Sequence, residues 1–457
     1  MAASSGSTVD VLIGSPRDSF MDAVKVILKG YYPYQLRQFK TVDEALESQN
    51  FHPILALIDG QDGSNSTNEW VQSVKMNFSD CHVIVLHSAA APLNFDAIKK
   101  NGADEMMHIN FDREFISDMV LQLAPVEMEG DNIPITALMP VDLRDIEAQM
   151  NINFDVYVHL PANHRSVLMR KAGDILDEKQ IAKFLGLKQQ MYIKKTQRKE
   201  FFEYARTVQS LRNSPFPVSM TEKFHRSKKA IYEIMAQFLN GAATDFSGGR
   251  LIFDKCKEII ADFELTKDLD KETLFTEIFR FTGNTRTLYH DCICLSAYAA
   301  FFAQAMGWGP EKRESAALAG LLHNVGLSQM PVAMAEKDPQ YYTPEELKEF
   351  HLYPDRSVNM VKAKKVPLSV EISEAIGQHR EKVNGKGFPK ALPGEDLSDL
   401  GKLMIFAYRF MELTSLREHR QAMPPAQALQ LLRDNSIEAT DDGLDMLTAT
   451  TIFKKYK

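Results

Sequence analysis

The sequence predicts a multidomain protein, with an α/β domain first, a small α+β unit in the middle and an all-α domain last. Short apolar runs alternate with helical patterns at the start of the chain, as in parallel sheets that helices cover. A β-branched, alternating segment, Phe154–Leu160, then indicates a strand. From about Ala205 onward, apolar residues recur at helical spacing.

The first domain is built from short apolar strands separated by amphipathic helices. A strand that helices cover on both faces is a short, continuous apolar run. Three segments fit this description, Val9–Ile13, Pro53–Ile58 and Val83–Leu86. Helical spacing of apolar residues predicts helices at Ser19–Leu28, Ala97–Asn101 and Arg113–Leu123.

The remaining elements follow a polar, acidic stretch at residues 127–132, which is typical of a linker. The expected domains are therefore 1–125, 126–204 and 205–457. The middle unit adds strands at Ser166–Arg170 and Gln190–Ile193 and a helix at Ile181–Leu185. Further helices are expected at Ile231–Leu239, Leu251–Phe263, Leu274–Phe281, Leu288–Met306, Ala316–Leu322, Glu345–Phe350, Leu403–Leu413 and Ala426–Leu432. The apolar region Leu274–Met306 is the expected face of a homodimer.

Composition narrows the function classes. With 44% hydrophobic and 25% charged residues, the chain is typical of a globular protein. A net charge of −8 argues against a nucleic-acid partner. We expect no membrane span and no signal peptide, because no segment has the ~20 apolar residues that a bilayer requires. The four cysteines contain no CxxC pair, so we expect a cytoplasmic protein.

The first 120 residues resemble a response-regulator receiver domain, through the order of their elements and the segment Gly102–Glu105. The resemblance places Asp59 at the phospho-acceptor position and Ser88 at the switch position. Receivers hold Mg²⁺ with acidic residues after the first strand, where this chain has Gly14-Ser15. Their lysine after the last strand is here Ile109.

Phosphoryl transfer needs a metal and cations that neutralise the moving charge. We therefore expect a pseudo-receiver, in which Asp59 lacks these partners, is inactive and remains only as part of the fold. Such a domain is expected to dimerise or to dock a partner protein.

The last domain resembles HD-GYP domains, a family of bacterial signalling proteins that hydrolyse cyclic di-GMP with two or three bound metals. Four segments carry this resemblance in the family's order and spacing: His323–Pro331, Thr343–Pro354, His379–Pro389 and Leu413–Arg420. The resemblance covers about 250 residues and implies the helical HD-superfamily fold.

The resemblance also implies where metal ligands lie. Three ligand histidines map to His290, His323 and His379. Six other positions depart from the family's pattern. Asn324 and Tyr408 replace aspartates, Leu327 a lysine, Tyr353 and Arg380 histidines, and Arg286 an acidic residue.

A cluster without carboxylates, and with added arginines, is not expected to hold a metal pair. We therefore expect no catalytic residue and no cofactor. In one alternative the three imidazoles hold a single divalent metal, Zn, Fe or Mn. In another they are structural histidines of the core. The directions of Arg286 and Arg380 bear on this choice.

The loop that gives HD-GYP domains part of their name is represented by Gly385, Lys386, Gly387, Phe388 and Pro389. In the family this loop serves substrate recognition and contacts with other signalling proteins, including diguanylate cyclases. Lys386, Arg417 and Arg420 either face a phosphate or lie on the surface, and we expect the surface.

These features lead to one main hypothesis and two alternatives. The main hypothesis is a signalling protein with a catalytically degenerate HD-GYP domain, which acts by protein–protein interaction or ligand sensing in cyclic di-GMP-related signalling. The first alternative is a residual phosphodiesterase with a reduced metal site. The second is an effector that binds cyclic di-GMP without cleaving it.

Overall fold

The computed structural model describes most of the chain in two compact units, Met1–His225 and Arg226–Lys457. The described residues are 9–28, 34–48, 51–87, 93–109, 113–126, 128, 133–160, 165–186, 190–212, 219–239, 246–264, 288–330, 334, 339–415, 422–437 and 443–455. The domain boundaries at 125 and 204 remain predictions.

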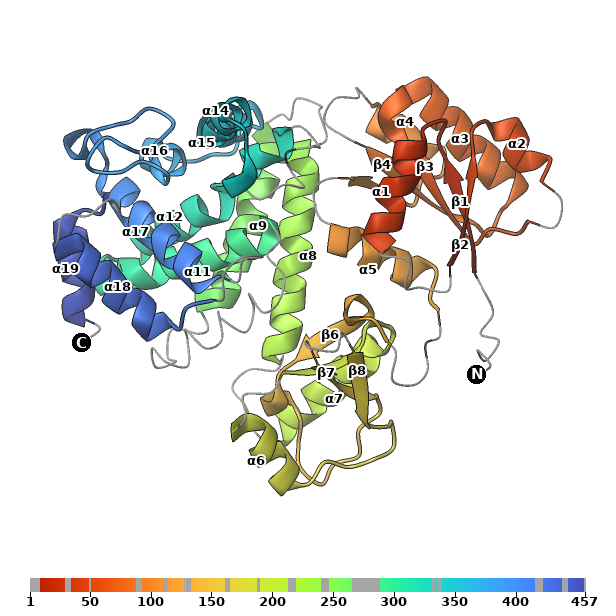
Figure 1. Ribbon diagram of the computed structural model, residues 1–457, viewed down its shortest axis with the longest axis horizontal. Coiled ribbons are helices and arrows are strands. Elements are labelled where there is room, and N and C mark those ends of the chain that lie inside the picture. The colour runs from red at the N-terminus through yellow and green to blue at the C-terminus, as the bar shows by residue number, and fades with distance from the viewer. Residues whose placement is uncertain are drawn as a thin grey trace. The chain divides into compact units, whose positions relative to one another are not determined.

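The first unit begins with a five-stranded parallel sheet in the order β2-β1-β3-β4-β5 (Figure 1). Its strands are β1 (Val9–Gly14), β2 (Tyr34–Phe39), β3 (Leu55–Asp59), β4 (His82–His87) and β5 (Glu105–His108). This order is that of flavodoxin-like folds, in which ligands bind at the carboxyl ends of the strands. The predicted α/β fold is confirmed, and Asp59 lies at that edge.

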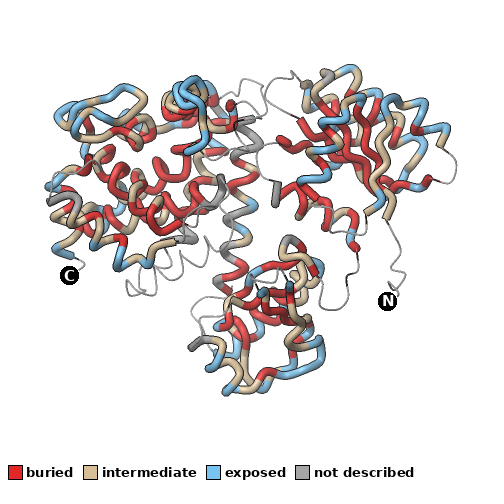
Figure 2. The backbone as a smooth tube through the Cα atoms, in the orientation of Figure 1, coloured by how far each residue is buried: buried red, intermediate tan, exposed pale blue. Residues whose placement is uncertain are grey.

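Helices cover this sheet in two layers, because α1 contacts α5 while α3 contacts α2 and α4. They are α1 (Asp18–Leu28), α2 (Val42–Leu46), α3 (Ser64–Asn77), α4 (Phe95–Lys100) and α5 (Arg113–Leu123). Strands β1, β3, β4 and β5 are largely buried, as Figure 2 shows, whereas the edge strand β2 is half-buried. Between β3 and α3 lies a short 3-10 turn, η1 (Gly60–Asp62).

The middle of the chain forms a four-stranded antiparallel sheet in the order β6-β9-β7-β8. Its strands are β6 (Leu138–Val141), β7 (Val156–Leu160), β8 (Arg165–Arg170) and β9 (Met191–Lys194). Helices α6 (Glu178–Gly186) and α7 (Arg198–Leu211) and the 3-10 turns η2 (Ile135–Ala137), η3 (Leu143–Asp145) and η5 (Lys195–Gln197) complete it. Phe154 and Phe201 lie at its centre, with ring centroids 5.1 Å apart.

The described elements of the second unit are helices, as predicted. They include α9 (Phe246–Glu264), α11 (Leu288–Ala305), α12 (Pro310–Leu322), α14 (Pro344–His351), α15 (Tyr353–Ala363), α16 (Val370–Gln378), α17 (Asp399–Thr414), α18 (Pro425–Ile437) and α19 (Met446–Lys455). Helix α8 (Met220–Leu239) begins in the first unit and continues into the second. The short turns are η6 (Val325–Gln329), η7 (Pro339–Tyr341) and η8 (Gly394–Asp396). The expected helix Leu274–Phe281 lies outside the described residues.

Helices α11, α12 and α17 form the core of the second unit. Tyr298, Phe302 and Phe410 pack edge to face or stacked between α11 and α17. Gly320 allows α12 to approach α11, because a Cβ there would lie 2.6 Å from the backbone nitrogen of Ser296. The described side chains of α11 are mostly buried in the core of their own chain, and the expectation that Leu274–Met306 forms a dimer face remains a prediction.

Among the described helices, none combines the length and the apolar character needed to cross a bilayer.

Candidate functional site

Two of the three predicted ligand histidines meet inside the second unit. His323 and His379 follow the last turns of α12 and α16, and each is 1% exposed. Their ring centroids are 4.9 Å apart, with the planes nearly perpendicular at 84°. The third, His290, is in α11, but its side chain lies outside the described residues, as does Arg286.

Backbone carbonyls orient both imidazoles. Nδ1 of His323 lies 2.7 Å from the carbonyl oxygen of Gly320, and Nδ1 of His379 lies 2.6 Å from that of Ile376. A carbonyl oxygen only accepts, so each Nδ1 carries the proton. In a neutral ring, Nε2 is then the nitrogen with a lone pair that can accept a hydrogen bond or bind a metal.

That lone pair of His379 faces a tyrosine. The hydroxyl oxygen of Tyr353 lies 2.6 Å from Nε2 of His379, and both side chains are buried. Burial, with a smaller contribution from His323, lowers the pKa of His379 well below its usual value. Burial also raises the pKa of Tyr353 well above its usual value. The ring is therefore neutral and the hydroxyl protonated, so Tyr353 donates to His379.

Arg380 points toward aromatic and acidic neighbours. Its guanidinium carbon lies 4.4 Å from the ring centroid of Tyr408 and 4.8 Å from that of Phe388. It also donates a hydrogen bond to the Tyr408 hydroxyl and lies 3.6 Å from a carboxylate oxygen of Glu412. Burial lowers the pKa of Arg380, but its neighbours, Tyr408 first, raise it above the usual value overall. Arg380 is thus a fixed cation.

Asn324 and Leu327 have structural contacts of their own. Oδ1 of Asn324 accepts a hydrogen bond from Sγ of Cys292 at 2.9 Å, and both residues are buried. Burial raises the pKa of Cys292 well above its usual value, so the thiol keeps the proton that it donates. Leu327 packs against a small core cluster that contains Phe350 and Tyr353.

The loop Gly385–Pro389 lies beside these residues, and Glu381 binds the backbone that directly follows the loop. This carboxylate is 1% exposed and accepts the backbone N–H groups of Lys390 and Leu392 at 2.7 and 3.0 Å. The backbone at Gly387 passes so close to that of Glu381 that only glycine fits, since a Cβ there would lie 2.4 Å from the Cα of Glu381. Phe388 stacks on His351, with ring centroids 4.1 Å apart and an interplanar angle of 14°.

The outer face of the loop carries Lys386, which is exposed as predicted. Arg417 and Arg420 lie outside the described residues.

These side chains do not fit a two-metal centre. Tyr353 and Tyr408 lie against the two imidazoles, and neither is a carboxylate. In the part of the chain that the structure describes, no three His, Cys, Asp or Glu side chains gather as metal ligands would.

The receiver-like sheet presents a second candidate site at Asp59. This carboxylate is 3% exposed and forms a two-point ion pair with Arg17, at 2.6 Å to Oδ1 and 3.1 Å to Oδ2. The Ser15 hydroxyl donates to Oδ2 at 2.6 Å. The expectation that Asp59 lacks a cationic partner is therefore wrong. Ser88 lies outside the described residues.

Two histidines that the sequence analysis did not identify lie at the same edge. His87 ends β4 and His108 ends β5, paired in register, with ring centroids 5.5 Å apart. Burial, together with His87, lowers the pKa of His108 to about 3. Ile109, at the position of the receiver lysine, is buried and donates its N–H to the carbonyl of His87.

The family model that matches this chain covers the residues of the candidate site. The family model described as HD domain matches residues 269–443. The 3'3'-cGAMP-specific phosphodiesterase 3 of Vibrio cholerae serotype O1 is 31% identical over 70 residues, 15% of this chain and 15% of that protein. The corresponding phosphodiesterase 1 is 26% identical over 133 residues, 29% of this chain and 30% of that protein. The chain therefore matches less than a third of the length of these relatives.

Solved structures with likeness to the chain include a HDG"Y"P protein from Bdellovibrio bacteriovorus. It has a TM-score of 0.43 and 18% identity, over 69% of this chain and 98% of that one. A response regulator from Thermotoga maritima has a TM-score of 0.23 and 21% identity, over 25% of this chain and 97% of that one.

Proposed function

We propose that this chain is a signalling protein, with a receiver-like domain followed by an HD domain of the HD-GYP type. In this proposal the HD domain binds a cyclic dinucleotide or a partner protein but does not hydrolyse cyclic dinucleotides. The observation that supports this most is the hydrogen bond of 2.6 Å from Tyr353 to Nε2 of His379. The main hypothesis from the sequence, a catalytically degenerate domain, is kept.

The first argument concerns the lone pair of His379. A metal bound at Nε2 has to displace the Tyr353 hydroxyl, which then loses its acceptor inside the protein. An unsatisfied buried polar group costs about 1 to 3 kcal/mol. Tyr353 does not offer an anionic ligand in return, because burial raises its pKa well above the usual value.

The second argument concerns charge. Metal-dependent phosphohydrolysis requires carboxylates that hold and bridge cations. At the positions of the family's aspartates this chain has Asn324, bound to a thiol, and Tyr408, bound to Arg380. After burial and His323, the charge of Arg380 also lowers the pKa of His379, so the guanidinium opposes a metal cation at that ring.

The relatives suggest which ligand class to test. Two similar proteins are named 3'3'-cGAMP-specific phosphodiesterases, so a cyclic dinucleotide is the first candidate ligand for this chain. A domain that binds such a ligand without cleaving it is an effector. A domain that binds no nucleotide acts through protein contacts, for which the loop Gly385–Pro389 offers a fixed surface. Diguanylate cyclases are the proposed partners of that loop.

The contacts of the receiver-like domain support the same proposal, that of a signalling protein without catalytic activity. Arg17 already neutralises Asp59, in the place where receivers bind a divalent cation. We assign this domain to constitutive docking or homodimerisation in the cytoplasm. Asp59 is then a structural ion-pair partner and no phospho-acceptor.

Turnover and binding assays on the full chain separate these readings. The chain is incubated with cyclic di-GMP or 3'3'-cGAMP in the presence of Mn²⁺ or Fe²⁺, and linear products are sought by chromatography. We expect none. Product formation that His379→Ala abolishes supports the residual phosphodiesterase and contradicts the proposal. Calorimetry with both dinucleotides then distinguishes the effector, which releases or absorbs heat, from the protein-docking module, which does not.

A further inference from the structure

The guanidinium of Arg380 has more hydrogen-bond donors than the described residues around it have acceptors. A guanidinium carries five N–H groups. Nη1 donates to the Tyr408 hydroxyl, and the Tyr353 hydroxyl is a second acceptor. A carboxylate oxygen of Glu412 lies 3.6 Å from Nη1, which is beyond hydrogen-bond distance. Among the described residues these two hydroxyls are its only hydrogen-bond acceptors, so most of its N–H groups remain available.

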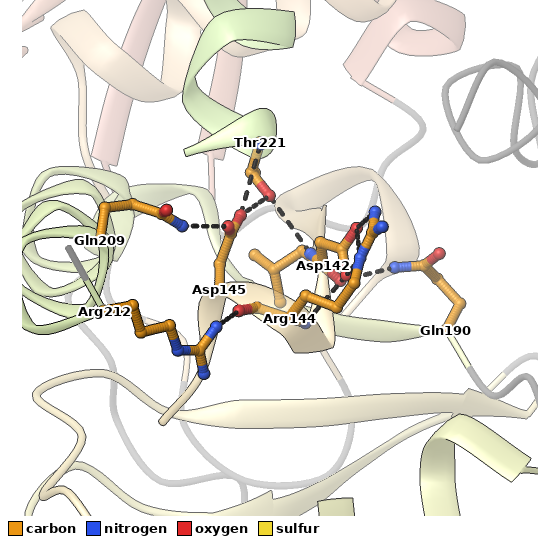
Figure 3. Close-up of polar contacts among 8 residues, drawn as sticks. Asp142, Arg144, Asp145, Gln190, Gln209, Arg212 and Thr221 are labelled. Atoms are coloured by element: carbon orange, nitrogen blue, oxygen red, sulfur yellow. Dashed lines mark hydrogen bonds and ion pairs between the residues drawn. The ribbon is translucent and has the colours of Figure 1, made fainter. Parts of the chain in front are cut away.

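Two arginines of the middle α+β unit, shown in Figure 3, have donors that the protein itself occupies. Arg212 donates to a carboxylate oxygen of Glu147 at 2.6 Å and to the backbone carbonyl of Arg144. Arg144 in turn donates to both carboxylate oxygens of Asp142. Each of these cations has a carboxylate within hydrogen-bond distance, whereas Arg380 has none in the part of the chain that the structure describes.

The ionisable groups around Arg380 leave a positive charge. Glu412 also lies 3.3 Å from Arg409, so one carboxylate faces two guanidinium groups. The imidazoles of His351 and His379 are neutral, because burial lowers their pKa values and the charge of Arg380 adds to the effect. These five groups therefore carry two positive charges and one negative charge, which favours an anionic ligand.

The remaining donors of Arg380 are accessible to a ligand. The guanidinium carbon lies 4.4, 4.8 and 5.9 Å from the ring centroids of Tyr408, Phe388 and Phe350, and ring faces attract a cation without satisfying its N–H groups. The side chain is 18% exposed, and none of its nitrogens is both buried and without a partner. The nitrogens that have no acceptor therefore face solvent. Their planar fork matches two oxygens of a phosphate.

We propose that Arg380 is a phosphate-binding residue, whose free N–H groups hold one phosphodiester of a cyclic dinucleotide through two parallel hydrogen bonds. This inference rests on the proposed function, in which the HD domain binds such a ligand and does not hydrolyse it. The positive charge that a phosphodiester requires comes from the guanidinium, so the dinucleotide binds without a divalent metal.

Calorimetry on the full chain in a buffer with a metal chelator tests this role. Cyclic di-GMP and 3'3'-cGAMP are titrated separately, and we expect the wild type to bind at least one of them. Arg380→Gln should weaken that binding by about ten- to a hundredfold, which is the contribution of a hydrogen bond to a charged group. Arg250→Gln is the matched control, because Arg250 lies in the same unit, is 63% exposed and pairs with Asp254, so it should bind as the wild type does. Inorganic phosphate, titrated in the same way, should bind more weakly than the dinucleotide.

A second variant keeps the test decisive if circular dichroism shows that Arg380→Gln fails to fold. Arg380→Lys keeps the charge but not the planar fork, so it should also weaken binding, by a smaller factor. Wild-type affinity in either variant, no heat from the wild type with either dinucleotide, or inorganic phosphate that binds as tightly as the dinucleotide would each overturn the inference. The proposed function fails by a different result, the formation of linear products in the turnover assay.

Discussion

The hydroxyl of Tyr353 and Nε2 of His379 lie 2.6 Å apart within the HD domain, both buried. This hydrogen bond occupies the ring nitrogen of His379 that carries the lone pair. A metal at that nitrogen would have to displace the Tyr353 hydroxyl.

Removing this hydroxyl should destabilise the protein. Tyr353→Phe leaves the lone pair of His379 without its donor in a buried site, which costs about 1 to 3 kcal/mol of unfolding free energy. Urea unfolding followed by circular dichroism measures the loss. Tyr341→Phe is a matched control, because Tyr341 is 61% exposed and should tolerate the change. Equal stability of both variants would mean that the Tyr353 bond contributes nothing.

Removing the counter-ion of Asp59 should destabilise the receiver-like domain. Arg17→Met leaves a carboxylate that is 3% exposed without its cation. Ser15 and the N–H of Gln61 still bind it, and the Arg17 side chain is 34% exposed, so we expect a loss of about 1 to 3 kcal/mol. Trp70 packs beside Gly14 and reports unfolding by fluorescence in a Trp308→Phe background. Lys25→Met, which removes an exposed lysine, is the control and should unfold as the wild type does.

Acidification should destabilise the first unit through His108. Its pKa in the folded protein is about 3, well below the ordinary value of 6.5 that applies in the unfolded chain. Between these values the unfolded chain binds a proton that the folded one does not. Stability should therefore fall as pH is lowered, by at most about 1.4 kcal/mol per pH unit from this group.

The same Trp70 fluorescence measures this dependence in a urea series at several pH values. His108→Asn should flatten it, whereas His52→Asn, at an exposed position, should leave it unchanged. A His108→Asn profile as steep as that of the wild type would assign the dependence to other groups.

The loop of the HD domain should not tolerate a side chain at Gly387. A Cβ there would lie 2.4 Å from the backbone of Glu381, so Gly387→Ala has to move the loop and should cost about 1 to 3 kcal/mol. Hydrogen exchange should rise in Val383–Gly394. Gly309→Ala, at a site with nothing within 4 Å of the new methyl group, should leave exchange as it is. Unchanged exchange in Gly387→Ala would show that the loop has room to adapt.

The sequence predicted the fold where apolar patterns were strong. The runs at Val9–Ile13, Pro53–Ile58 and Val83–Leu86 are strands of the parallel sheet, because a strand covered on both faces has to be apolar. Strand β2 was missed, since its sequence YQLRQF is polar and it lies at the edge of the sheet. Helix α3 was missed because its polar sequence gives a weak apolar stripe.

The sequence predicted that certain residues lie together in the candidate site, but it did not predict the contacts that their side chains make. Motif spacing placed His323 and His379 in one site, and the structure brings their rings together. Spacing does not give the direction of a side chain, so the bond from Arg380 to Tyr408 and that from Cys292 to Asn324 were not anticipated. Arg17 and Asp59 are 42 residues apart in the chain, and no local pattern links them.

Metal content after reconstitution tests the central claim most directly. The purified chain is incubated with Mn²⁺, Fe²⁺ or Zn²⁺, freed of excess metal by gel filtration and analysed by inductively coupled plasma mass spectrometry. The variant Asn324→Asp, Tyr353→His, Arg380→His, Tyr408→Asp is treated in the same way. It carries the ligand types that the resemblance to HD-GYP domains implies at these positions. We predict that the wild type retains only traces of metal and that the variant retains more. A stoichiometric metal pair in the wild type would contradict the account.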